Sequence, residues 1–248
     1  MRSVRVLTFN IRYGGRGRED QLIATILASS PDVVLLQEAT RASVVERLAE
    51  GAGMRQWATF KRQSLGFLSR EPVEHFEWHR PRFSRHAFLE VVPAATAVRL
   101  FGVHLSAVHA AWTERRRLFE VRALLKSIER HQSGMHALAG DFNTLAPGEL
   151  LDPARLPRRL RPFVWLSGGQ IRWRTIREVL DAGYVDAFRH LHPTEPGPTF
   201  PTNDPHIRLD YVFVPRQFAD RISACEIPAA KIARQASDHL PLLAELRV

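Results

Sequence analysis

The stretch MHALAGDFNT, residues 135–144, joins a short apolar run to a group of small and polar residues. The run 135–139 has the length and composition of a buried β-strand. Asp141 and Asn143 follow at its end, beside Gly140. α/β sheets commonly gather reactive side chains at the carboxyl ends of their strands, so both residues are candidate site residues. An ordinary Asx turn is the alternative interpretation of the pair.

Similar apolar runs on both sides of this stretch predict an alternation of strands and helices. Further strands are expected at 4–9, 33–36, 65–68, 97–105 and 209–214. Two helical faces are expected from Leu22, Ile23, Ile26 and Leu27 and from Leu118, Val121, Leu124, Leu125 and Ile128. The capping-box pattern from Thr175 to Glu178 predicts the start of a third helix, and Gly183 its end. The chain contains no repeats, which favours one α/β domain with mixed sheets over residues 1–248.

Polar residues interrupt or close the other predicted strands as well. Asn10 closes the first strand, Glu38 follows the second, and His104 lies near the end of 97–105. Each has a structural alternative: Asn10 as a turn residue, Glu38 as a carboxylate near a helix N-terminus, and His104 as a core histidine. Their recurrence at strand ends nevertheless predicts a shared site.

Two acidic positions near the C-terminus extend this pattern. Asp210 lies inside the apolar run 209–214, where an unpaired buried carboxylate would be costly and demands a partner. The pair Asp238-His239 precedes the last apolar run, and His239 is a candidate partner for Asp210.

Taken in order, six segments resemble the endonuclease/exonuclease/phosphatase superfamily of deoxyribonuclease I-like, metal-dependent phosphoesterases along the whole chain. They are LTFNIR, LLQEAT, GVHLS, GDFNT, RLDYVFV and SDHLPL. The resemblance implies a four-layer α/β sandwich, in which two facing mixed β-sheets are flanked by helices and the site lies at one end. It also implies hydrolysis of a phosphate ester.

The resemblance assigns expected roles to the interrupting residues. Glu38 and Asp238 would offer hard oxygen ligands to Mg²⁺, for which Mn²⁺ can substitute, with support from Asn10. The expected catalytic residues are His104, Asp141, Asn143, Asp210 and His239. Asp141 would orient or deprotonate the attacking water, Asn143 would donate to the phosphate, and Asp210 would orient His239. Whether the base is Asp141 or His239 stays open, and His104 would protonate the leaving oxygen or donate to phosphate.

Residues 12 and 104 bear on the branch of the superfamily. Exonuclease III-like repair nucleases tend to carry tyrosine at the position of His104 and an acidic residue at that of Arg12. The chain is therefore more similar to deoxyribonuclease I, sphingomyelinases and 5-phosphatases, and abasic-site repair is less expected.

A basic loop and helix insertion is predicted around 147–182, with a long loop over 147–169 that is rich in Pro, Arg and Gly. Its arginines alternate with Phe163, Trp165 and Trp173, a combination that suits a phosphate backbone and exposed bases. Alternatively, the arginines solvate the loop and the tryptophans pack on the domain. The candidate substrate contacts are Arg12, Arg158, Arg159, Arg161, Arg172 and Arg174.

Charge favours an anionic partner. The formal net charge is +9, although only three of the 35 basic residues are lysines, and a GC-rich genome would also produce this arginine excess. DNA is the leading substrate, with a phospholipid or small phosphorylated metabolite as the alternative. Cys225 is the only cysteine, so no internal disulfide forms. No apolar stretch approaches the roughly 20 residues needed to span a bilayer, and no signal-peptide pattern is recognised. We expect a cytoplasmic monomer without membrane insertion. The histidines other than His104 and His239 are expected to be surface or packing residues.

Overall fold

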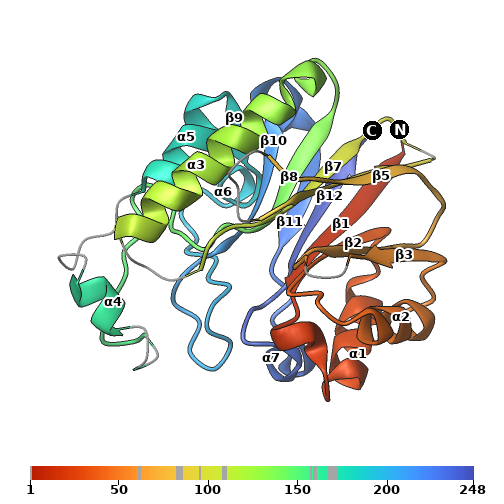
Figure 1. Cartoon of the computed structure of the whole chain (residues 1–248), viewed down its shortest axis with the longest axis horizontal. Helices are drawn as coiled ribbons and strands as arrows, with labels where there is room; N and C mark the ends of the chain where they lie inside the picture. The colour runs from red at the N-terminus through yellow and green to blue at the C-terminus, as the bar shows by residue number, and fades with distance from the viewer. Residues whose placement is uncertain are drawn as a thin grey trace.

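Two six-stranded sheets lie face to face and carry helices on their outer sides (Figure 1). The computed structural model describes residues 2–60, 63–81, 86–94, 96–107, 111–156, 158, 161–166 and 173–248, with the backbone alone at 111, 163 and 166. The expected four-layer sandwich is confirmed.

The first sheet has the order β11-β12-β1-β2-β4-β3. Its strands are β1 (Ser3–Asn10), β2 (Val33–Gln37), β3 (Gln56–Thr59), β4 (Gly66–Ser69), β11 (Ile222–Glu226) and β12 (Leu242–Arg247). β1 and β2 pair in parallel and the other neighbours are antiparallel, so the sheet is mixed.

The second sheet has the order β5-β6-β7-β8-β10-β9. Its strands are β5 (Val73–His79), β6 (Phe88–Pro93), β7 (Arg99–His104), β8 (His136–Asp141), β9 (Tyr184–Asp186) and β10 (Asp210–Pro215). Only β7 and β8 run parallel among these pairs. The one parallel pair in each sheet brings two carboxyl ends to the same edge of that sheet.

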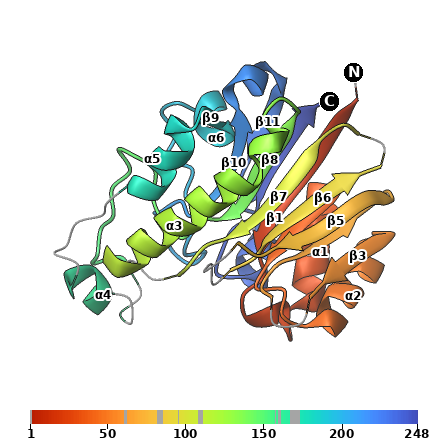
Figure 2. The same ribbon diagram turned by 45° about the horizontal axis from the view of Figure 1, so that its top comes forward.

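Helices cover the outer faces (Figure 2). The helices are α1 (Glu19–Ser29), α2 (Ala42–Gly51), α3 (Ala111–Ser127), α4 (Arg161–Leu166), α5 (Arg174–Asp181), α6 (Ala187–Leu191) and α7 (Lys231–Ala236), with short 3-10 turns η1 (Tyr13–Gly15), η2 (Glu129–His131) and η3 (Arg216–Arg221). α1 and α2 pack on the first sheet, and α3 and α5 pack on the second. α4 projects beyond the sheets beside the start of α3 (Figures 1 and 2). None of the helices in the described ranges is long and apolar enough to cross a membrane.

The main core lies between the sheets and is built mostly from branched aliphatic side chains. It includes Val6, Leu35, Leu89, Leu100, Val212 and Leu242, all fully buried. Burial of such side chains removes apolar surface from water and stabilises the sandwich. Five of the buried polar residues, Asn10, His104, Asp141, Asp210 and His239, lie together at or near strand ends on one side of this core.

The predicted strands are all present, but six others were missed. Alternation is obscured in β5, whose exposed face carries charged and imidazole side chains, and β9 is only three residues long. α1, α3 and α5 confirm the three predicted helices, and Gly183, at φ +88°, follows the end of α5. The prediction of a capping box from Thr175 to Glu178 was wrong. Thr175 lies inside α5, and both its amide and its hydroxyl donate to Glu114 of α3, while Glu178 pairs with Arg122.

Candidate functional site

The candidate site lies where the carboxyl ends of β1, β7 and β8 meet the first residue of β10. Asn10, His104 and Asp141 each end a strand, and Asp210 begins one. The strand register pairs His104 with Asp141 and Asp141 with Asp210. Directly paired residues on neighbouring strands share one face of a sheet. The register alone therefore places these three side chains together.

Asp141 is the centre of this group. Its Oδ2 accepts a hydrogen bond of 3.0 Å from Asn10 Nδ2, across the two sheets, and its Oδ1 accepts one of 2.8 Å from the Asn143 backbone N–H. The Nε2 atoms of His104 and His239 both lie 3.9 Å from Asp141 Oδ2. Burial raises the pKa of the Asp141 carboxyl against the opposing effect of His239, and nearby Asp210 raises it further. Asp141 therefore holds a proton more readily than an ordinary aspartate.

His239 is oriented by Asp210. The distance from His239 Nδ1 to Asp210 Oδ2 is 2.9 Å, which directs Nε2 toward Asp141. Burial alone lowers the pKa of His239, but the carboxylates of Asp210 and Asp141 outweigh it and raise that pKa. The Phe200 ring packs on the imidazole at a centroid distance of 4.8 Å. The imidazole is thus fixed on two sides.

His104 has the opposite electrostatic character. Its Nδ1 lies 3.0 Å from Ser64 Oγ, and its ring centroid lies 5.7 Å from that of His86. Burial, with the neighbouring His86 and His239, lowers the pKa of His104 to about 3. A neutral imidazole can still donate one hydrogen bond from its protonated nitrogen. This favours hydrogen bonding to phosphate over protonation of the leaving oxygen.

A second cluster of charged groups adjoins Asn10 at the start of the loop after β1. Arg12 Nε lies 3.3 Å from Asp238 Oδ2, and Glu38 Oε2 accepts the Tyr13 backbone N–H. Burial and the nearby Arg12 lower the pKa of Arg18, while Asp238 and Glu38 act in the opposite direction. Arg12, Tyr13 and Glu38 all have positive φ between 50° and 58°. Such non-glycine backbone is costly and is concentrated at functional sites.

The arginines expected to contact substrate differ in exposure and in their hydrogen bonds. Arg158 and Arg174 are exposed, whereas the guanidinium of Arg161 donates to the carbonyls of Leu156 and Ala154 and so stabilises its own segment. Arg159 and Arg172 lie outside the described residues. Arg161 therefore has a local structural role in addition to any contact with substrate.

The two tryptophans of the insertion lie in different environments. Trp173 donates its indole N–H to the Glu149 carbonyl and packs beside the cluster of Phe200, Ile207 and Leu209. Trp165 is 77% exposed. Trp173 is therefore a packing residue, whereas Trp165 is exposed to solvent.

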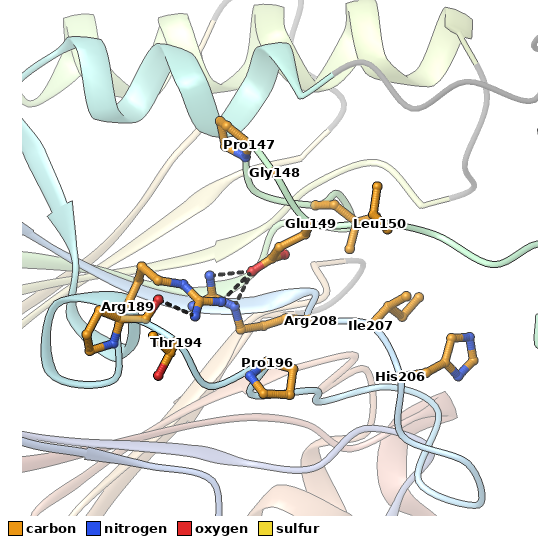
Figure 3. A pocket seen from close by; sticks show the side chains of 12 residues that line it. Pro147, Gly148, Glu149, Leu150, Arg189, Thr194, Pro196, His206, Ile207 and Arg208 are labelled. Atoms are coloured by element: carbon orange, nitrogen blue, oxygen red, sulfur yellow. Dashed lines mark hydrogen bonds and ion pairs between the residues drawn. The ribbon is translucent and has the colours of Figure 1, made fainter.

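A pocket of about 490 Å³ lies between the segments that leave Asn143 and enter Asp210 (Figure 3). Glu149 accepts hydrogen bonds from the guanidinium groups of Arg189 and Arg208 across it. Arg208 also contacts Asp186 at 2.6 Å. Burial alone would lower the pKa of Arg208, but Asp186 and Glu149 raise it above its ordinary value. This network anchors the residue two positions before Asp210.

Several site neighbours were missed from the sequence. Ser64, His86 and Phe200 contact His104 or His239 only through tertiary packing, and His86 was interpreted as a surface or packing residue. Ser237 had a local signal, since it precedes Asp238-His239. Its hydroxyl donates to the Asn10 carbonyl and ties this loop to β1.

Comparisons with known proteins identify the family of the chain. The sequence profile of the Endonuclease/Exonuclease/phosphatase family matches residues 7–239, and the chain belongs to that family. A search of curated protein sequences finds no significant match.

Solved structures share the fold over almost the whole chain. An AP endonuclease from Archaeoglobus fulgidus is 18% identical, with a TM-score of 0.75, covering 99% of this chain and 100% of that one. A 3' phosphatase, NExo, from Neisseria, bound to a product DNA hairpin, is 18% identical with a TM-score of 0.71 and coverages of 99% and 100%. An endonuclease/exonuclease/phosphatase from Beutenbergia cavernae is 21% identical with a TM-score of 0.74, covering 100% of this chain and 72% of that one. At these identities the likeness establishes the fold, and the branch expected from His104 and Arg12 stays a prediction.

Members of this family are divalent-metal-dependent phosphoesterases, and the site suits a cation. Asp141, Asp210 and His239 each offer one ligand atom, all within 4.8 Å of one another. Asp210 Oδ1 is buried and has no hydrogen-bond partner among the described residues. A buried carboxylate oxygen without a partner is costly, and a bound cation would remove that cost. The neighbouring Asn10, Glu38 and Asp238 supply further hard oxygen atoms of the kind that Mg²⁺ prefers.

Proposed function

We propose that this protein is a Mg²⁺-dependent nuclease that hydrolyses phosphodiester bonds in DNA. The observation that carries the proposal is the Asp210–His239 pair directed at Asp141, with the amide of Asn10 bonded to the same carboxylate. Hydrolysis of a phosphate ester requires an oriented water and stabilisation of the negative charge of the transition state. The site provides groups for both tasks.

Asp141 is suited to hold the attacking water. Its carboxylate is fixed by Asn10 and by the backbone N–H of Asn143, so its orientation is set before substrate binds. The side chain of Asn143 is held by a hydrogen bond of 3.0 Å to the Leu105 carbonyl, and its second amide hydrogen would donate to phosphate. His239, oriented by Asp210, would donate from Nε2 to a phosphate oxygen, and His104, whose Nε2 lies at the same distance from Asp141, would do the same.

Glu38, Asp238 and Asn10 are proposed to hold the cation. When bound, Mg²⁺ would neutralise phosphate charge and polarise the phosphorus–oxygen bond. In the structure the guanidinium of Arg12 forms an ion pair with the Asp238 carboxylate. It would turn to the substrate phosphate when the carboxylate binds the cation.

DNA is favoured by the net charge of +9 and by the exposed Arg158 and Arg174 of the insertion. Two of the similar structures support it by their descriptions, an AP endonuclease and a phosphatase bound to a DNA product. A phosphoesterase acting on phospholipid is the second candidate. It is favoured by the exposed apolar side chains Leu150 and Trp165, which are 82% and 77% accessible and suit an interfacial substrate.

An activity panel in Mg²⁺ would test the proposal. Duplex DNA, single-stranded DNA, RNA, phosphoinositide, sphingomyelin and nitrophenyl phosphate esters are compared at equal enzyme concentration, with His239→Ala as the inactive control. Preferential turnover of DNA that is lost in His239→Ala supports the nuclease. Preferential turnover of a lipid with no cleavage of DNA would replace it with the second candidate.

A further inference from the structure

One face of strand β5 carries a cluster of metal-ligand side chains far from the catalytic residues in sequence. His75, Glu77 and His79 occupy every second position, so they project from the same face of the strand. The intervening Phe76 and Trp78 project from the other face, where the Phe76 ring lies 5.1 Å from that of Phe67. The three ligand-type side chains are therefore on the outer face of the second sheet.

A fourth side chain comes from the neighbouring strand. Glu90 of β6 is paired directly with Glu77 in the antiparallel register. The Nε2 atoms of His75 and His79 lie 3.7 and 3.9 Å from Glu77 Oε2, and His79 Nε2 lies 2.6 Å from Glu90 Oε2. His75, Glu77 and Glu90 each offer a ligand atom within 4.8 Å of the other two.

These separations are near those of a tetrahedral metal site. Ligand atoms about 2.0–2.2 Å from a central Zn²⁺ lie roughly 3.3–3.6 Å from one another. The two distances to Glu77 need only a small contraction, and the His79–Glu90 contact, now 2.6 Å, needs to open by about 0.7–1.0 Å. Rotation of the half-exposed side chains of His75 and Glu77 supplies the contraction, and rotation of the His79 imidazole, which is 20% exposed, opens its contact with the buried Glu90.

The charges of the cluster also favour a cation. Carboxylates directly opposite each other on neighbouring strands repel. The guanidinium of Arg99 bonds to Glu90, which is only 2% exposed, and so balances one of the two negative charges. With neutral imidazoles, a charge of about −1 remains among Glu77, Glu90 and Arg99. The Arg99 contact also orients Glu90, as outer partners orient the ligands of established metal sites.

The cluster is separate from the catalytic site. Phe88, Phe101 and Val103 pack together under α3 on the same outer face. His104 is the next residue after Val103 in the strand, so it projects from the opposite face, toward the other sheet. An ion bound by β5 and β6 would thus lie across the sheet from the catalytic side chains.

We infer that His75, Glu77, His79 and Glu90 form a second metal site, selective for a divalent transition metal of the Zn²⁺ type. Imidazole together with carboxylate suits Zn²⁺, Co²⁺ or Ni²⁺, whereas Mg²⁺ prefers oxygen ligands alone. The ion joins the edge strand β5 to β6 and stabilises this edge of the sheet. The inference does not depend on the substrate of the catalytic site.

Calorimetric titration of the full chain with Zn²⁺ tests the site, in a Glu38→Gln/His239→Ala background that weakens metal binding at both ligand groups of the catalytic edge. We expect one site whose affinity falls at least about 10-fold in His75→Ala/His79→Ala and in Glu77→Gln. His190→Ala, an exposed histidine on α6, is the matched control and should leave the affinity unchanged. Co²⁺ should give the visible absorption of tetrahedral coordination in the background protein and lose it in the double variant.

Thermal unfolding supplies a second readout. Zn²⁺ should raise the melting temperature of the background protein and of His190→Ala, but not that of His75→Ala/His79→Ala, because only a site present in the folded state stabilises it. Circular dichroism checks that the variants are folded. Equal Zn²⁺ affinity in all of these proteins, or absence of binding to the background protein at micromolar Zn²⁺, would overturn the inference.

Discussion

His239 Nδ1 lies 2.9 Å from Asp210 Oδ2, and the opposite nitrogen of the same ring faces Asp141 at 3.9 Å. The contact fixes both the orientation of the imidazole and the nitrogen that faces the reacting group. Asp210 begins β10 and His239 follows α7, so tertiary structure brings together residues 29 positions apart.

His239→Ala should lower kcat by about 10²–10⁴-fold, because the imidazole that donates to phosphate is lost. Asp210→Asn should lower kcat as well, since an amide cannot stabilise the imidazolium as a carboxylate does. Steady-state rates on DNA and on a nitrophenyl ester provide the measurement. His190→Ala is the control, and near-normal turnover by His239→Ala on both substrates would contradict the proposed role.

Metal removal should abolish activity. EDTA is expected to leave the protein inactive and added Mg²⁺ or Mn²⁺ to restore it, because Glu38 and Asp238 otherwise repel the substrate phosphate. Glu38→Gln should require at least about 10-fold more Mg²⁺ for half-maximal rate, since it removes one charged ligand. Mg²⁺ titrations of initial rate compare it with Glu46→Gln, an exposed position on α2. Full activity in chelator would exclude a metal-dependent mechanism.

Much of the site could be predicted because its residues interrupt apolar strands at their ends. Asn10, His104, Asp141 and Asp210 all lie at strand termini, and the register then brings three of them together. The contacts of Phe200 could not be predicted in this way, because its packing on His239 depends on the conformation of the segment between α6 and β10. Local sequence carries no information on which ring such a segment places against another.

The fold was predicted in outline for a related reason. Buried central strands such as β2 and β8 contain continuous apolar runs, whereas the edge strand β5 is interrupted on its outer face by His75, Glu77 and His79. The capping-box error at Thr175 has a physical cause as well. Glu114 accepts both of its hydrogen bonds from a different helix, and this tertiary contact takes the place of the local cap.

Gly140→Ala should destabilise the protein strongly. A Cβ at this position would lie 1.9 Å from the Val103 carbonyl oxygen, and the backbone has φ +156°. Strain and steric overlap together should cost about 3 kcal/mol or more. Urea unfolding is the measurement, with Gly134→Ala as control, since its added Cβ would be no closer than 3.7 Å to its neighbours. Equal unfolding midpoints for the two variants would show that β7 and β8 can separate without cost.

Arg208→Met should also destabilise the fold, by about 3–5 kcal/mol, because Asp186 loses its buried cation and Glu149 keeps only the contact with Arg189 of its two guanidinium partners. Arg155→Met removes an exposed pair with Asp204 and should leave the urea midpoint nearly unchanged. The triple replacement of Arg208, Glu149 and Asp186 by apolar residues of similar size should recover part of the loss. An Arg208→Met midpoint equal to that of Arg155→Met would mean that water or other groups compensate for the missing guanidinium.

The basic insertion provides the prediction that separates a nuclease from an enzyme for small esters. Arg158→Gln/Arg174→Gln removes two exposed charges of the insertion. Each lost phosphate contact should reduce the magnitude of the log–log salt slope for duplex binding by about 0.9. Cleavage of a nitrophenyl phosphate ester should be unchanged, because that substrate does not extend to the insertion.

The matched control is Arg216→Gln/Arg247→Gln. It removes two exposed charges at the C-terminal ends of β10 and β12, and that end of β10 lies opposite Asp210. Both double variants change the net charge equally, so a purely long-range effect of charge would weaken DNA binding to the same extent in each. A loss confined to Arg158→Gln/Arg174→Gln identifies the insertion as a DNA contact. If neither affinity nor salt slope differs between the two variants, the insertion does not bind the duplex, and hydrolysis of a lipid or small phosphate ester becomes the better-supported function.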